Sequence, residues 1–261
     1  MDWGRRLSNR NLEGKIDVKK LYEKSEIWFS VLLIVLYVVG SSVADDLSRA
    51  VGVTKSVTLV FQFALAAVIW LFIRRNGLEK TYGLCKPAYP ASRFLFYVPL
   101  VVLASVNLWF GVQANYPAAE TLCYVGSMLL VGALEELIFR GFLFKAISRS
   151  NVTRAIVISS VTFGIGHIVN LVNGSGADLL SNLCQVCYAV AIGFLFVIIF
   201  YKGKSLVPCI VTHSVLNSLG AFGNEAANHA HVLLTSAVLI VVSVAYSLII
   251  IKGVDKPGAR A

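Results

Sequence analysis

Six costly polar side chains stand inside long apolar stretches of the sequence. They are Glu135, Glu136, Arg140, His167, His213 and Asn217. An ionisable group in a bilayer costs at least about 2.5–3.5 kcal/mol, so each of these residues needs a partner or a function. A carboxylate and an imidazole can take a proton from water, and imidazole and carboxamide N–H groups can stabilise an oxyanion. These residue types are therefore the parts of a site for water activation and oxyanion stabilisation.

The spacing separates the two glutamates. Glu136 and Arg140 are four residues apart, so on a helix they share a face and can form an ion pair. Glu135 lies about 100° further round the helix. We predict that Glu136 and Arg140 form a structural ion pair near the site, which leaves Glu135 for chemistry. The alternative is one buried charge network that contains all three residues.

The other motifs also place polar groups on one helix face. Phe163 and His167 are four residues apart, and two of the three residues between them are glycines, which permit close backbone approach. His213 and Asn217 are also four apart, so both side chains project together. Each motif alone is more typical of packing or interhelical hydrogen bonding than of catalysis.

Their depth in the predicted helices links the three motifs. At about 1.5 Å per residue, Glu135 lies about 15 Å and His167 about 20 Å from the basic residue at the inner end of its segment. His213 and Asn217 lie about 14 and 20 Å from theirs. Three separate segments therefore place polar residues at a similar level near mid-membrane.

Eight apolar segments must position these residues. They are Ile27–Ala44, Val57–Ile73, Phe94–Val112, Leu122–Phe144, Ala155–Val169, Leu183–Tyr201, Leu206–Phe222 and Val232–Ile251. With 57% hydrophobic and 14% charged residues, the chain is far more apolar than a soluble domain. Backbone polar groups in hydrocarbon must be satisfied internally, and the alternation of a barrel strand is absent, so these segments should be helical. We predict an all-α, polytopic integral membrane protein built as a bundle of eight transmembrane helices.

The basic residues predict its orientation. With the N-terminus inside, 20 of the 23 Lys and Arg residues fall on the inner side, two (Arg49 and Lys55) fall outside, and Arg140 lies within a span. We therefore predict a cytosolic basic arm (residues 1–26), a transmembrane domain (27–251) and a cytosolic tail (252–261). Cleavage after Ala44, where small residues suit a signal peptidase, is the alternative for the first segment.

The charge also bears on partners. A formal charge of +9 can indicate nucleic acid, but here the Lys and Arg residues are scattered between apolar runs and form no basic face with interleaved aromatics. We expect no nucleic acid partner. The expected partner is the lipid bilayer, together with a protein or peptide substrate.

Together the three motifs resemble those of the CAAX-protease and bacteriocin-processing (CPBP) family, which includes the type II CAAX prenyl endopeptidase. The EExxxR motif of that family is matched by residues Glu135 to Arg140, FxxxH by Phe163 to His167, and HxxxN by His213 to Asn217. The resemblance covers a motif core of about 122–222. Other members are bacterial proteins of bacteriocin maturation and self-immunity, so we expect the cell membrane of a bacterium.

The resemblance implies an intramembrane endopeptidase. In it Glu135, aided by His167, would activate a water, and His213 and Asn217 would hold the oxyanion. The bond cleaved would lie near the C-terminus of a membrane-associated or prenylated protein, or in a peptide precursor. Similar enzymes have a cavity open toward the cytosol, so a substrate's C-terminal segment could reach the water there.

Three alternatives remain open. Glu135, His167 and His213 could form a zinc set with an open fourth position, but the HExxH helix is missing and Asn217 suits an oxyanion donor better, so no cofactor is expected. A catalytically silent immunity or scaffold protein would carry the same motifs. A transporter would also carry intramembrane ionisable residues, although the sequence lacks the inverted repeats common in such folds.

Overall fold

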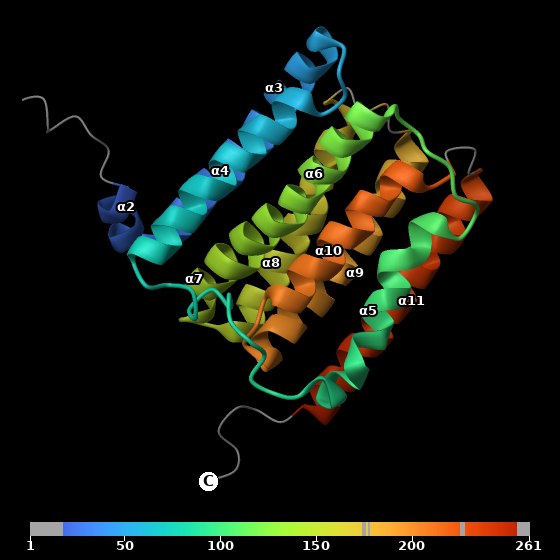
Figure 1. Ribbon diagram of the computed structural model, residues 1–261. Coiled ribbons are helices and arrows are strands. Elements are labelled where there is room, and N and C mark those ends of the chain that lie inside the picture. The colour runs from blue at the N-terminus through green and yellow to red at the C-terminus, as the bar shows by residue number, and fades with distance from the viewer. Residues whose placement is uncertain (1–17, 174–175, 177, 225–227, 255–261) are drawn as a thin grey trace, which may run out of the picture.

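The chain folds into an all-helical bundle in the computed structural model, which describes residues 18–173, 176, 178–224 and 228–254 (Figure 1). Parts of the predicted arm (1–17) and tail (255–261) lie outside the described residues. The elements in chain order are α2 Val18–Lys24, α3 Glu26–Val51, α4 Ser56–Arg75, η1 Ala91–Tyr97, α5 Val98–Ser105, η2 Val106–Leu108, α6 Ala118–Glu135, η3 Glu136–Phe144, α7 Lys145–Ser148, α8 Val152–Gly166, η4 His167–Leu171, α9 Leu179–Gly203, α10 Val207–Ser218, η5 Leu219–Phe222 and α11 His229–Gly253.

Polar residues between the apolar segments fix the helix ends. The Ser25 side chain accepts a hydrogen bond from the Trp28 backbone N–H and so caps α3, while Asn151 and Asp178 cap α8 and α9 in the same way. At the other end of α3, Gly52 adopts the left-handed conformation common after a helix. The helix boundaries therefore follow from local sequence.

Within the described residues, seven helical stretches, some of them made of several consecutive elements, are long and apolar enough to cross a membrane. They account for seven of the eight predicted segments. The remaining segment, Leu206–Phe222, forms the 12-residue α10 and the four-residue η5, which together fall short of the length of the other spans. Length and composition therefore support an integral membrane protein with seven candidate spans and one shorter apolar helix.

The third predicted segment, Phe94–Val112, is not one regular helix. Leu95, Phe96 and Tyr97 have positive φ angles, which break the helix, and α5 covers eight residues after them. Tyr246 of α11 donates a hydrogen bond to the Phe94 carbonyl at this break. A side chain from another helix thus satisfies a backbone group that an unbroken helix would have bonded internally.

The fourth segment contains a π-helix. Helix α6 continues without a gap into η3, whose hydrogen bonds run to the fifth residue, and then into α7. Every residue of η3 is buried. The tight packing of this stretch is relevant to the site because Glu135 is the last residue of α6.

The two ends of the bundle differ in the charged residues that they carry. We call one the basic end; it carries Arg74, Arg75, Lys145, Arg149, Arg154, Lys202, Lys204 and Lys252. The other, the opposite end, carries Asp45, Asp46, Arg49, Lys55, Glu120 and Asp178. The helices run alternately between these ends, so the fold has a basic face and a face with an excess of acidic residues among those described.

Glycines bring the site-bearing helices together. A Cβ atom on Gly132 of α6 would lie 2.3 Å from Ser214 Oγ of α10, and one on Gly164 of α8 would lie 2.2 Å from the Val190 side chain of α9. Small residues allow helix backbones to approach closely in a membrane. The contact at Gly132 brings α6 close to α10, and Glu135 lies three residues further along α6.

Candidate active site

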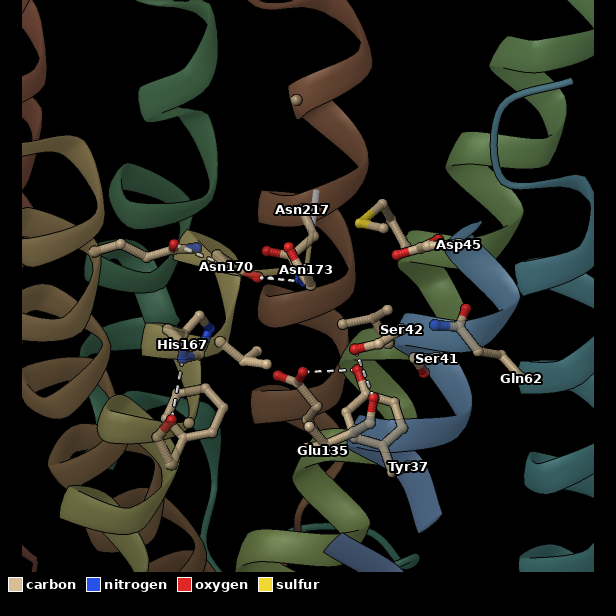
Figure 2. A pocket seen from close by; sticks show the side chains of 18 of the residues that line it. Tyr37, Ser41, Ser42, Asp45, Gln62, Glu135, His167, Asn170, Asn173 and Asn217 are labelled. Carbon is tan, nitrogen blue, oxygen red and sulfur yellow. Dashed lines mark hydrogen bonds between the residues drawn. The ribbon is translucent and has the colours of Figure 1, made fainter. Parts of the chain in front are cut away.

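Glu135 lies where α6 meets the π-helix, and its side chain is 13% exposed. Tyr37 Oη of α3 donates a 2.7 Å hydrogen bond to Glu135 Oε1 (Figure 2). The other oxygen, Oε2, lies 3.6 Å from His213 Nε2 and has no hydrogen-bond partner among the described residues. One carboxylate oxygen is thus held in place, while the other is buried and unpaired among the described residues.

Glu136 and Arg140 lie beneath Glu135 and are fully buried. Arg140 Nη1 is 3.1 Å from Glu136 Oε1, and the guanidinium stacks on the Phe163 ring at 3.9 Å from its centroid. The same Glu136 oxygen lies 2.9 Å from His213 Nδ1. Glu136 therefore contacts both the Arg140 guanidinium and the His213 imidazole. The contact with His213 was not predicted from the sequence.

His213 is held at one nitrogen of its ring. Its Nδ1 lies within hydrogen-bond distance of Glu136, its Nε2 faces Glu135 at 3.6 Å, and the residue is 6% exposed. Phe163 and Phe196 contact it through their rings. The hydrogen bond at Nδ1 and the ring contacts orient the imidazole, so that its Nε2 points toward Glu135.

His167 lies within the predicted segment Ala155–Val169, at the point where α8 passes directly into the 3-10 helix η4. The helix ends at Gly166 and the chain continues as η4. His167 Nδ1 is 3.0 Å from the Phe163 carbonyl, and Asn182 donates to the His167 carbonyl. The contact at Nδ1 leaves Nε2 as the nitrogen for other partners.

A polar cavity of about 460 Å³ brings three of the four predicted catalytic residues together. Glu135, His167 and Asn217 all line it, from α6, from the start of η4 and from α10 (Figure 2). Its volume lies within the range typical of ligand sites. His213 lines an adjoining cavity of about 130 Å³ whose wall also includes His167 and Asn217. The four residues therefore line two adjoining cavities, which share His167 and Asn217 in their walls.

Several lining residues come from the first two spans, where the sequence analysis made no functional prediction. Tyr37, Ser41, Ser42 and Asp45 of α3 and Gln62 of α4 all face the cavity (Figure 2). A tyrosine and an acidic residue inside or at the end of an apolar segment were the available signals. Without the fold, nothing placed them beside Glu135.

The residues of the zinc alternative do not form a ligand set. Among the described residues, no three His, Cys, Asp or Glu side chains are grouped so that they could hold a metal ion. Both nitrogens of His213 already face carboxylates, and His167 Nδ1 already faces a carbonyl. The donor set therefore does not fit a shared metal ion in this arrangement.

The cavity also runs in an unexpected direction. From Glu135 it extends toward the opposite end of the bundle, where Asp45 and Lys55 form its rim. By resemblance to similar enzymes, we expected the cavity of this chain to open toward the cytosol. The charge distribution places the cytosol at the basic end. This expectation does not hold if the basic loops are cytosolic.

Comparison with known families bears on residues 117–219. This region matches the family model described as Type II CAAX prenyl endopeptidase Rce1-like. The match covers all three motifs and confirms the resemblance to the CPBP family over this part of the chain. It supports an intramembrane endopeptidase at the level of the family. Searches of curated proteins and of solved structures found no match.

Proposed function

We propose that this chain is an intramembrane endopeptidase that uses Glu135 as its general base. The observation that carries the proposal is the position of the Glu135 carboxylate at the bottom of a polar cavity within an apolar bundle, with one oxygen held by Tyr37 and the other without a hydrogen-bond partner among the described residues. A buried carboxylate with an available oxygen and space for water is suited to proton abstraction.

In this mechanism Glu135, aided by His167, takes a proton from water as its oxygen attacks the scissile carbonyl carbon. The carbonyl oxygen becomes an oxyanion. The tetrahedral intermediate then collapses, the C–N bond breaks, and the proton held by Glu135 passes to the departing amine. The products are a carboxylic acid and an amine, so the atoms of one water molecule are accounted for.

His213 and Asn217 supply the oxyanion donors in this proposal. His213 Nδ1 lies 2.9 Å from Glu136 Oε1, and its Nε2 faces the region next to Glu135, where an Nε2–H would donate to the oxyanion. Asn217 lines both hollows and contributes an N–H that needs no proton transfer.

We further propose an eight-crossing topology with both termini in the cytosol of a bacterium. Helices α9 and α11 both end at the basic end, at Lys204 and Lys252, so the chain between them must return to the opposite end. Helix α10 with η5 makes that return.

Cleavage of a panel of membrane-presented peptides by the purified protein tests the function. Glu135→Gln should abolish cleavage and leave the fold intact, because the amide keeps the size of the side chain but cannot take a proton. Glu120→Gln is the matched control, since Glu120 lies on the same helix, outside the cavity lining, and bonds the Thr54 backbone N–H. Turnover retained in Glu135→Gln would overturn the mechanism.

The same assay with a zinc chelator tests the metal-free chemistry. Cleavage that needs Glu135 and survives the chelator supports a glutamate protease. Loss of activity that zinc restores would favour the zinc set of Glu135, His167 and His213. No cleavage of any peptide would favour a silent immunity or scaffold protein.

A further inference from the structure

The bottom of the cavity lies near Glu135, and its walls rise toward the opposite end. Along α3 the lining runs from Tyr37 to Asp45, about 12 Å at the helical rise, and along α6 it runs from Glu135 back to Tyr124, about 16 Å. Both directions lead away from the basic end. Figure 2 shows Tyr37 and Glu135 at one level and Asp45 and Asn173 at another.

The route from Glu135 to the basic end is filled. Residues 136–144 are all buried, and they occupy the stretch of helix between Glu135 and Lys145. Near that end an aromatic cluster joins three helices and the loop after α4: the Phe142 ring lies 5.5 Å from Phe29 and 4.3 Å from Tyr82, and Tyr22 packs on Phe29. A polypeptide could not reach Glu135 from this side without displacing a packed core.

The rim at the opposite end is polar and cross-linked. Lys55 Nζ lies 2.8 Å from Asp45 Oδ1, and Arg49 donates a 3.0 Å hydrogen bond to the Asn173 carbonyl. Asp45 and Lys55 side chains are 19% and 23% exposed, so they meet solvent at the mouth of the cavity. The cavity thus joins an aqueous surface on that side.

The wall chemistry favours a peptide over a lipid chain. Six lining residues carry carboxamides: Gln62, Asn107, Asn170, Asn173, Gln185 and Asn217. A carboxamide offers a donor and an acceptor, as a peptide group does. Ser41 Oγ also lines the cavity and has no hydrogen-bond partner among the described residues. A prenyl chain would bury its apolar surface poorly against such walls.

We infer that the cavity takes an extended, unprenylated polypeptide segment from the extracytoplasmic side of the membrane. This inference rests on the proposed function and on the positive-inside rule, which places the basic end in the cytosol. The substrate class is therefore a membrane-anchored protein or peptide whose scissile segment has been translocated. A prenylated tail presented in the cytosol would approach the filled end.

Sided labelling tests the access direction without relying on catalysis. In intact cells, an impermeant maleimide applied outside should label the cavity residue of the Ser42→Cys variant. The amount of labelling should exceed that of the parent chain, which is the baseline because its own Cys187 is exposed. Lys80→Cys, in the loop at the basic end, should be labelled above that level after permeabilisation only. Labelling of Ser42→Cys that needs permeabilisation would overturn the inference.

Two reporters with the same membrane anchor and the same polar segment test the substrate. The reporter with its segment outside should be cleaved, and Glu135→Gln should prevent this cleavage. Glu135-dependent cleavage of the cytosolic reporter alone would preserve the proposed function and overturn the inference. If neither reporter is cleaved, the proposed function fails. The labelling result then decides from which side of the membrane the cavity is reached.

A pair of CAAX peptides, one prenylated and one not, tests the chemical class with the purified protein. The unprenylated peptide should be cleaved at least as fast. A preference of about tenfold or more for the prenylated peptide, equivalent to about 1.4 kcal/mol, would overturn the assignment to a polypeptide segment.

Discussion

Removal of the Arg140 guanidinium should strongly destabilise the bundle. Its side chain is fully buried, lies 3.1 Å from Glu136 and stacks on Phe163. Arg140→Met keeps an unbranched apolar chain of similar length but leaves the Glu136 carboxylate opposed by His213 alone. Breaking a buried ion pair by removing one partner costs about 3–5 kcal/mol, so we expect a loss of this size.

The assay is thermal unfolding of the purified protein in detergent. For soluble proteins of similar size, 1 kcal/mol corresponds to about 2–4 °C, so Arg140→Met should lower Tm by roughly 6–20 °C. Glu136→Gln should also destabilise, because it leaves the buried guanidinium unpaired. The double variant should be more stable than the sum of the two losses predicts, because it leaves neither charge of the pair buried.

An exposed ion pair provides the control. Arg149 lies 2.6 Å from Glu26, but its side chain is 66% exposed. Arg149→Met should therefore cost no more than about 1 kcal/mol. Equal and small effects of Arg140→Met and Arg149→Met would refute the reasoning, because they would mean that the Glu136–Arg140 pair is not a desolvated ion pair.

Three further outcomes are expected. Tyr37→Phe should lower kcat more than it raises KM, because it removes the hydrogen bond that holds Glu135 while leaving the ring in place; an unchanged kcat in the peptide assay would contradict a positioning role. Gly132→Ala should reduce Tm, since its Cβ would lie 2.5 Å from the Ser214 backbone nitrogen, whereas Gly253→Ala, where a Cβ meets nothing within 4 Å, should have little effect. Cleavage should persist after exhaustive treatment with a zinc chelator, as measured by product formation against an untreated sample.

Some features of the fold could be read from the sequence because they depend on local composition. Apolar runs between charged loops identified the spans, and the caps at Ser25, Asn151 and Asp178 lie where those runs begin. The third segment was predicted less well. At its break, the Tyr246 hydroxyl from a helix distant in sequence hydrogen-bonds the Phe94 carbonyl, a contact that local composition does not reveal.

The site shows the same division. The motifs predicted Glu135, His167, His213 and Asn217 as site residues, because an ionisable or amide group in hydrocarbon is rare enough to stand out. The contact of Glu136 with His213 and the contact of Tyr37 with Glu135 join residues 77 and 98 positions apart in the chain. No periodicity within a helix encodes such pairs.

The direction of the cavity depended on packing as well. The depth of the polar residues and the charge of the loops could be predicted from the sequence, since both follow from counting residues along single helices. The aromatic cluster that fills the basic end and the six carboxamides that line the route from the opposite end come from helices far apart in sequence. Where a hollow opens is set by which side chains meet across helices, and that is a property of the packed bundle.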